Sequence, residues 1–374
     1  MRKSLLILIV FLTIGSIVLS VVFVNSNLSP DSSSAYSTNQ NLKYFGYMGL
    51  DSVEYIQESY KLRSNNIGHF SAPVIIKTAQ GNIYEVNKPD LTAKMQAFTN
   101  TYQKAIIGVQ WVFFADLKAG GNGQGAVLAS NWEKRWNDFL EGVKGYEDSI
   151  YAIYFDEPFY NGVSKDQLLK VLLKIRFDLP KTNLMVVEGY DVLEKALTSY
   201  AGILDYITDY GFDYYFTQYP QATFAKYMEY FNKMVAKLPQ RMKIWLIPDG
   251  FAYNSGTVNS LVRNFDLYAD LAKSNDRVVG MLTFIYKTTD SGLGMNIRDL
   301  FDVNNANYSK TLKDKHYYLG QIALTNHKIY KRICSGFSYS NWGSCVNKSQ
   351  TRFLVSKSPY ACEGGNPIIT NVCN

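Results

Sequence analysis

Short apolar runs alternate with longer amphipathic stretches over most of this 374-residue chain, between residues 41 and 328. Such an apolar run is typical of a buried strand, and an amphipathic stretch with helical periodicity is typical of a helix. Regular alternation of the two predicts βα units and a parallel sheet. Eight units over about 290 residues predict an α/β fold of the (β/α)₈ TIM-barrel type. The candidate strands are 43–48, 67–70, 105–114, 150–155, 183–188, 213–219, 243–248 and 278–286.

A doubly wound open sheet is the alternative fold for the same alternation. Nucleotide-binding sheets of that kind carry a glycine-rich turn after the first strand, and neither G-x-G-x-x-G nor G-x-x-x-x-G-K-[ST] occurs there. The barrel is therefore preferred, with residues 71–89 as an insertion after the second strand. Helix-like stretches are expected at 132–143, 165–177, 192–204, 224–238, 257–274 and, closing the barrel, 312–328.

The N-terminus has the pattern of an export signal. Arg2 and Lys3 precede the uncharged apolar stretch 5–24. About 20 residues at ~1.5 Å each span ~30 Å, which is enough to cross a bilayer. We expect residues 1–25 to be a signal anchor or a cleaved signal peptide, with the rest of the chain extracytoplasmic and, if the segment is uncleaved, held at the membrane. The Ser- and Asn-rich residues 26–40 are predicted to be a flexible linker.

The cysteines form a local cluster at the other end of the chain. All four lie within the last 41 residues, which fits two disulfides in an exported protein. Metal binding is the alternative, but the cluster contains no C-x-x-C pair and its spacings are wide. We expect a small disulfide-stapled, β-rich module at 333–374, stapled by Cys334, Cys345, Cys362 and Cys373.

Several classes of function find little support in the composition. The net charge of +6 is spread along the chain without a block of Lys or Arg, so nucleic-acid binding is not expected. The chain has three histidines, and none lies in H-E-x-x-H or another metal-ligand spacing. No serine lies in the G-x-S-x-G pattern of esterases. We expect no metal and no cofactor.

Acidic residues recur where the candidate strands end. The fourth strand runs directly into Asp156, Glu157 and a proline, the fifth ends at Glu188, and the seventh is followed by Asp249. The active sites of (β/α)₈ enzymes lie at the carboxyl ends of the strands, so these acids are expected at one face. The simpler interpretation is that the Asp-Glu-Pro sequence only caps a turn.

Glycoside hydrolysis requires two carboxyl groups on either side of one bond. Adjacent residues of a strand point to opposite sides, so Asp156 and Glu157 are not expected to form that pair themselves. We predict Glu157 as general acid/base, Asp249 as the second carboxylate and Glu188 as its substitute, with Asp156 in substrate binding. Further polar and aromatic residues near strand ends are predicted to bind hydroxyls or stack on sugar rings: Gln110, Trp111, Tyr215, Gln218, Tyr219, Trp245 and Tyr286.

The sequence Tyr-Phe-Asp-Glu-Pro at 154–158 resembles the Y-x-D-E-P signature of glycoside hydrolase-like barrels in secreted bacterial proteins. It is also similar to a larger glycosidase clan with the acid/base after strand four and the nucleophile after strand seven. That resemblance implies Glu157 and Asp249 for these roles. The expected substrate is a polysaccharide or surface glycan, and the alternative is a non-catalytic carbohydrate-binding or adhesion protein on the same scaffold.

The C-terminal segment resembles a bacterial thrombospondin type 1-like repeat. In that family a W-x-x-C start is followed by a T-R strand, and here Trp342 and Arg352 occupy the matching positions. The resemblance implies a stacked Trp–Arg pair, which with disulfides replaces a core too small to fold alone, in an adhesive or glycan-binding module. Three cysteine pairings are open, of which we favour Cys345 with Cys373 and Cys334 with Cys362.

Overall fold

A computed structural model describes residues 41–77, 83–115, 126–215, 223–252, 255–287, 294–327, 336–346, 348–352, 354–358 and 368–373. In these ranges no helix is long and apolar enough to span a bilayer. Several predictions fall outside the described residues: the export segment 1–25, the linker 26–40, Gln218, Tyr219, Cys334 and Cys362.

Eight parallel strands form the centre of the molecule: β1 (Tyr44–Tyr47), β2 (Ile67–Ser71), β5 (Lys104–Gly108), β8 (Ile150–Asp156), β9 (Asn183–Glu188), β10 (Asp209–Asp213), β11 (Lys243–Ile247) and β13 (Val278–Thr283). They close in the order β1-β13-β11-β10-β9-β8-β5-β2, and each strand pairs in parallel with both neighbours. The predicted (β/α)₈ barrel is confirmed, and the open sheet is excluded because the strand order closes.

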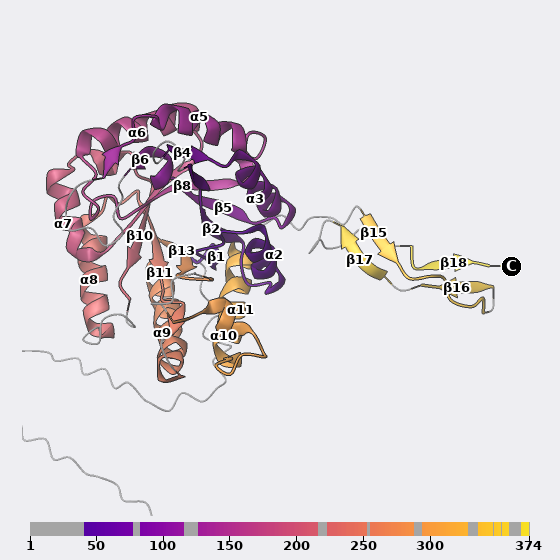
Figure 1. Cartoon of the computed structure of the whole chain (residues 1–374). Helices are drawn as coiled ribbons and strands as arrows, with labels where there is room; N and C mark the ends of the chain where they lie inside the picture. Colours follow the sequence, from indigo (N-terminus) through magenta and orange to yellow (C-terminus); the bar gives the residue numbers. More distant parts are fainter. Residues whose placement is uncertain are drawn as a thin grey trace, which may run out of the picture.

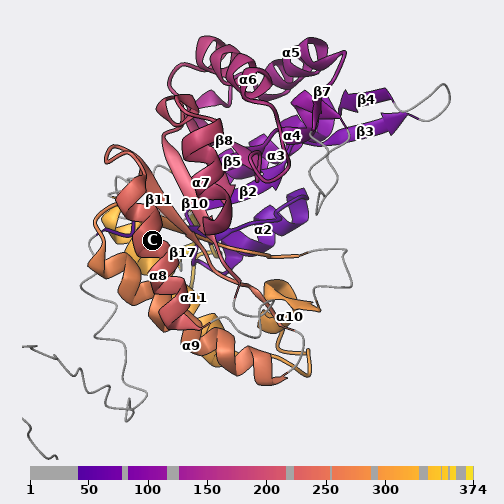
Figure 2. The same ribbon diagram turned by 90° about the vertical axis from the view of Figure 1, so that its left-hand side faces the viewer.

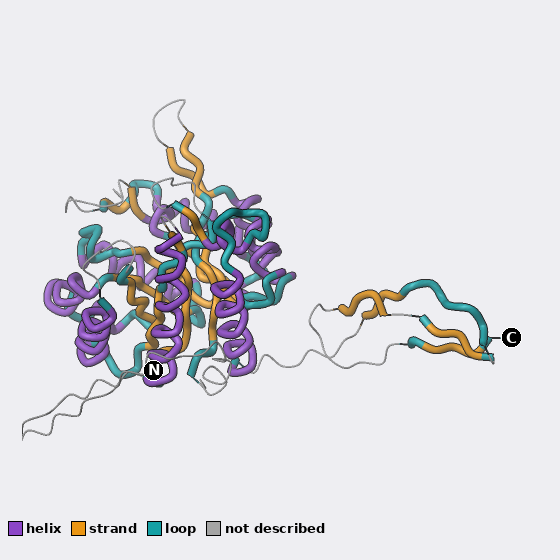
Figure 3. The backbone as a smooth tube through the Cα atoms, turned by 90° about the horizontal axis from the view of Figure 1, so that it is seen from below, coloured by secondary structure: helices purple, strands orange, loops and turns teal. Residues whose placement is uncertain are grey.

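Helices form a ring outside the strands (Figure 1), and the same ring is visible from below (Figure 3). Six of them begin at a Ser, Thr or Asn whose side chain accepts a backbone N–H three residues further on, the usual N-cap arrangement. The helices are α2 (Val53–Lys61), α3 (Lys88–Asn100), α4 (Gln110–Phe113), α5 (Trp132–Val143), α6 (Lys165–Asp178), α7 (Tyr190–Ser199), α8 (Phe224–Lys237), α9 (Ser255–Ser274), α10 (Ile297–Phe301) and α11 (Lys310–Asn326), with 3₁₀ turns at Glu147–Ser149 and Ile203–Asp205.

Strand side chains alternate between two apolar clusters. On β8, Ala152 and Tyr154 belong to the cluster inside the barrel, whereas Ile153 and Phe155 belong to the layer between strands and helices. The interior is filled at its floor by the fully buried Trp245, and a Cβ on Gly280 would overlap its ring. The barrel is therefore a packed core, open to ligands only at the strand ends.

Two predicted strands were placed wrongly. The third ends at Gly108, and residues from Gln110 onward turn into the short helix α4. The sixth lies at Asp209–Asp213, before the aromatic run that suggested 213–219. Its sequence contains two Asp and a Gly, which hide the strand signal, and contacts in the barrel floor hold it instead. Residues 71–89 do contain an insertion, the hairpin of β3 (Val74–Lys77) and β4 (Ile83–Val86), which projects from the barrel in Figure 2.

Four small antiparallel strands follow the barrel: β15 (Gly336–Tyr339) pairs with β17 (Leu354–Ser358), and β16 (Ser349–Thr351) with β18 (Thr370–Val372). The predicted Cys345–Cys373 disulfide is confirmed. The Arg352 guanidinium lies 4.2 Å from the centre of the Trp342 ring and 3.5 Å from that of Tyr339. This stacked arginine and the disulfide hold a segment whose described side chains are half-buried or exposed. Two further short pairs border the barrel, β6 (Phe114–Ala115) with β7 (Val127–Leu128) and β12 (Phe251–Ala252) with β14 (Met295–Asn296).

One core histidine makes folding sensitive to acid. His316 on α11 is fully buried against the rings of Phe45, Tyr47, Phe265 and Phe301. Neither ring nitrogen has a hydrogen-bond partner among the described residues. Burial lowers the pKa of His316 to about 3, from an ordinary 6.5, because a charged imidazole would be desolvated there.

We expect the free energy of unfolding to fall as the pH is lowered from about 6.5 towards 4. In this range His316 binds a proton in the unfolded chain but stays neutral in the folded protein. The slope from one such group is about 1.4 kcal/mol per pH unit. Urea unfolding at pH 7, 6 and 5 should therefore show a shallower pH dependence for His316→Phe than for wild type. Phe301→Leu, a control in the same cluster, should keep the wild-type slope. Equal slopes for His316→Phe and wild type would contradict this account.

Candidate active site

The carboxyl ends of β8 and β10 bring two acids to the mouth of the barrel. Asp156 follows Ala152 and Tyr154 on the interior side of β8, at the last strand position. On β10, a Cβ on Gly211 would touch interior side chains of β9, so Asp213, two residues later, faces the same way. Asp156 is exposed and Asp213 is half-buried. Both carboxylates are thus accessible at the face where barrel enzymes bind their substrates.

Asp156 accepts a hydrogen bond from the hydroxyl of the buried Tyr154. Desolvation by the surrounding protein raises the pKa of Asp156 above its ordinary value, and the bond from Tyr154 partly offsets this by stabilising the carboxylate.

The backbone of Glu157 is no longer extended, because β8 ends at Asp156. Its φ is +43°, in the left-handed region that costs a non-glycine residue about 1 kcal/mol or more. The backbone on both sides is held: the Glu157 N–H donates to Val187 at 3.0 Å, and its carbonyl accepts from the Asn161 N–H at 2.8 Å. The expectation that neighbouring acids point to opposite sides of an extended strand therefore does not apply, because β8 has ended at Asp156.

Tyr215 connects the acids of the mouth electrostatically. It packs against Phe284 with ring centres 5.4 Å apart, at the edge of the interior cluster. Burial raises its pKa well above 10, and the carboxylates of Asp213, Asp156, Glu157 and Asp249 raise it further. A tyrosine that stays protonated among carboxylates is a hydrogen-bond donor for substrate or for one of them.

Glu188 points away from the mouth. Its strand neighbour Val187 faces the barrel interior, so Glu188 faces the helix layer, where it is fully buried. Its Oε1 accepts the N–H of Phe159 at 2.6 Å and that of Tyr160 at 3.4 Å. Burial raises the pKa of Glu188 well above its ordinary value. A carboxyl so enclosed does not reach a substrate, so the predicted catalytic substitute has no access in this structure.

Asp249 is also removed from solvent. It is 1 % exposed, and the hydroxyl of Tyr268 on α9 lies 3.4 Å from its Oδ1. Pro248 interrupts the strand before it, and the residue pairs with Phe284 in an isolated bridge. The acid is at the strand end, as predicted, but it is enclosed on the α9 side, so it is poorly placed to act as the second carboxylate.

A polar pair lies beside this mouth on β2 and α4. A Cβ on Gly108 would come 3.0 Å from His69 Nε2 and 3.3 Å from Gln110 Oε1, so the two side chains are close neighbours. The His69 ring stands edge-on to Tyr154, with ring centres 4.8 Å apart. Burial lowers the pKa of His69 to about 4, so the imidazole is neutral at pH 7. Gln110 and Trp111 are half-buried on α4 rather than on a strand.

Two predicted sugar-stacking residues are elsewhere. Trp245 lies in the barrel floor and donates its indole N–H to the buried Asp209 at 2.8 Å, so it has no face for a sugar. Tyr286 is 3 % exposed and packs outside the barrel between β1 and α2. Both errors have one reason: an aromatic residue near a strand end can face the floor, the mouth or the helix layer.

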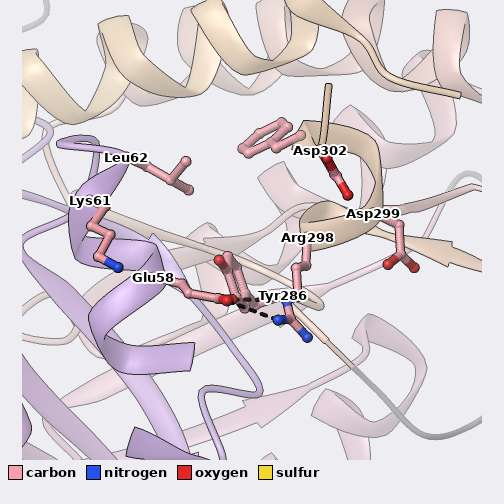
Figure 4. A pocket seen from close by; sticks show the side chains of 8 residues that line it. Glu58, Lys61, Leu62, Tyr286, Arg298, Asp299 and Asp302 are labelled. Carbon is pink, nitrogen blue, oxygen red and sulfur yellow. Dashed lines mark hydrogen bonds and ion pairs between the residues drawn. The ribbon is translucent and has the colours of Figure 1, made fainter. Parts of the chain in front are cut away.

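Tyr286 instead lines a cavity of about 420 Å³ between α2 and α10 (Figure 4). Arg298 crosses it and pairs with Glu54 at 2.7 Å and Glu58 at 2.8 Å. Its guanidinium is thereby satisfied within the protein. Within the described ranges, no group of three or more His, Cys, Asp or Glu is arranged to hold a metal ion.

Asp213 is the acid that sequence reasoning missed as a site residue. The sixth strand was predicted to begin at Asp213, which placed this residue at the wrong end of the barrel. The alternation Asp-x-Gly-x-Asp over 209–213 could have indicated a strand with a polar or small inner face.

The chain was compared with known proteins. No protein-family model matches it, and no curated protein sequence matches it either. Among solved structures, β-glucuronidase 2 of Bacteroides uniformis, covalently bound to cyclophellitol-6-carboxylate aziridine, has a TM-score of 0.50 at 9% identity, over 84% of this chain and 40% of that one. Xylanase B of Clostridium stercorarium F9 has a TM-score of 0.48 at 11% identity, over 75% of this chain and 98% of that one. At such identities the likeness shows the fold, a barrel of the kind found in glycoside hydrolases.

Proposed function

We propose that this chain is an extracytoplasmic glycoside hydrolase that cleaves a polysaccharide by two-carboxylate catalysis. The observation that carries the proposal is the cluster of acids at the barrel mouth: Asp156 and Glu157 from the end of β8 and Asp213 from the end of β10 all interact electrostatically with Tyr215. Glycoside hydrolysis needs a proton donor and a second carboxylate on either side of the bond.

In this proposal Glu157 gives its proton to the departing glycosidic oxygen. Asp213 takes the second role that the sequence suggested for Asp249, because it is half-buried at the mouth whereas Asp249 is 1 % exposed. Asp156, oriented by Tyr154, binds a substrate hydroxyl. The neutral His69 and the Gln110 amide lie beside Tyr154 and add further polar groups next to these acids.

The proposal includes export and a C-terminal binding module. Support for export comes from Arg2, Lys3 and the apolar stretch 5–24, and from the Cys345–Cys373 disulfide, since such bonds persist outside the cytoplasm. The stacked Trp342 and Arg352 support the thrombospondin type 1-like interpretation, in which the module holds the enzyme on a glycan or protein surface.

The test is a screen of the purified chain against extracellular and cell-wall polysaccharides, with release of reducing ends as the measurement. We expect one glycan class to be cleaved by wild type and not by a variant carrying both Glu157→Gln and Asp213→Asn. If glycans are bound but none is cleaved, the alternative of a non-catalytic binding protein is correct. Cleavage by the double variant at the wild-type rate would remove both residues from the mechanism.

A further inference from the structure

The turn that follows β8 is fixed from behind the barrel. Glu188 accepts the N–H groups of Phe159 and Tyr160, the second and third residues after Glu157. On the same side, Lys195 of α7 donates to the Phe159 carbonyl at 2.7 Å, and the ring of Tyr200 packs on Phe159 at 4.8 Å. These contacts come from β9 and α7, which are the next elements along the barrel.

Glu188 is the acidic member of this support, and it is close enough to Glu157 for the two side chains to interact electrostatically. It is fully buried, and its strand partner Phe212 belongs to the helix-side layer. Glu157 is bonded to the same strand through its N–H and the Val187 carbonyl, at 3.0 Å. Two sets of hydrogen bonds thus connect the left-handed Glu157 and the turn after it to β9. The Glu157 N–H donates to the Val187 carbonyl, and the Phe159 and Tyr160 N–H groups donate to the Glu188 side chain.

We propose that Glu188 is a positioning residue for Glu157: its carboxylate holds the 157–160 turn from the helix layer, and so keeps the Glu157 side chain at the mouth. The inference rests on the proposed function for its catalytic consequence, but the structural part stands by itself. A left-handed non-glycine residue persists only where its surroundings fix it. Without Glu188 the buried Phe159 N–H and the part-buried Tyr160 N–H lose their acceptor, so we expect the turn to relax.

Hydrogen exchange followed by mass spectrometry tests the structural part without any substrate. In Glu188→Ala, peptides covering 156–163 should exchange about tenfold faster or more, because the Phe159 and Tyr160 N–H groups lose their acceptor. In Glu188→Gln they should remain close to wild type, since the amide oxygen accepts the same two N–H groups. If Glu188→Ala does not fold, Glu188→Asp serves instead: its carboxyl is one methylene too short, and the same local acceleration is expected.

A matched control separates positioning from general loss of stability. Asp178 on α6 also accepts a side-chain N–H, from Trp136 at 2.6 Å, but does not contact the turn. Asp178→Ala should raise exchange around α5 and α6 and leave 156–163 unchanged. On a cleaved glycan, Glu188→Ala should lose kcat at least tenfold with little change in KM, and Glu188→Gln should recover most of it.

The proposal is overturned if Glu188→Ala leaves exchange of 156–163 at the wild-type rate, or if the acceleration is spread over the whole barrel. It is also overturned if the turn loosens and kcat on a cleaved glycan does not change. Failure of the glycan screen removes the proposed function but leaves the exchange result, so the two failures are distinguishable.

Discussion

Glu157→Gln is expected to lower kcat/KM on the cleaved polysaccharide by about 10²- to 10⁴-fold, the usual contribution of a positioned general acid. The glutamine has nearly the same size and keeps an acceptor, but it has no proton to give to the glycosidic oxygen. An aryl glycoside of the same sugar with a strongly acidic phenol needs little protonation to depart. The departure step for that substrate should therefore be much less affected in Glu157→Gln, measured as the rate of phenol release in the first turnover.

Asp213→Asn is the control for this experiment, because a second carboxylate is required whatever the leaving group. It should lose activity on the polysaccharide and on the aryl glycoside alike. Asp156→Asn distinguishes the neighbouring acid: the surrounding protein raises the pKa of Asp156, a property that also suits a proton donor. If Asp156→Asn, and not Glu157→Gln, shows the leaving-group dependence, the acid role belongs to Asp156.

Arg277→Met is expected to destabilise the fold by about 3 kcal/mol or more, the largest stability effect we predict for a single side chain. Arg277 precedes β13, is 8 % exposed and donates to four backbone carbonyls at the end of α8 and the loop after it. The acceptors are Val235 at 2.9 Å, Leu238 at 3.4 Å, Pro239 at 2.7 Å and Met242 at 3.2 Å. Methionine fills the space but removes the donor of the Val235, Leu238 and Met242 carbonyls, whereas the Pro239 carbonyl keeps the Met242 N–H at 2.9 Å. Urea unfolding followed by tryptophan fluorescence is the measurement.

Arg241 provides the matched control, because it makes the same kind of contact at the surface. Its guanidinium donates to the Leu204 and Ile207 carbonyls at 2.9 Å each, but its side chain is 47% exposed. Water can replace it, so Arg241→Met should cost less than about 1 kcal/mol. Equal losses for Arg241→Met and Arg277→Met would show that burial of the arginine side chain is not the cause.

The architecture was predictable because it depends on patterns that the sequence states directly. Eight apolar runs separated by amphipathic stretches define the barrel, and most predicted strands agree with the observed ones to within a few residues. The sixth strand was missed because Asp209 and Gly211 look like loop residues until Tyr151 and Trp245 are seen to donate hydrogen bonds to Asp209. Contacts between distant strands override local preference at such a position.

The sequence predicted at which end of the barrel the candidate site lies, but it predicted less well which side chains form it. The strand ends at Asp156, Glu188 and Asp249 were identified, but only one of these three carboxylates is open to solvent. Alternate residues of a strand lie on its inner and outer faces. An acid near a strand end can therefore lie on the inner face, as Asp156 does, or on the outer face, as Glu188 does. A proline such as Pro248 breaks the alternation, so counting residues past it no longer gives the direction.

By itself, therefore, the sequence determined that this chain forms a (β/α)₈ barrel, that acids cluster at the strand ends, and that the cysteines gather near the C-terminus, where the structure pairs Cys345 with Cys373. These follow from periodicity, turn residues and local composition, which act over short stretches. Only the tertiary structure decided that Asp213 joins Asp156 and Glu157 at the mouth while Glu188 and Asp249 are enclosed. The direction of a side chain depends on strand register and on where each strand ends, and both are set by packing between elements far apart in the chain.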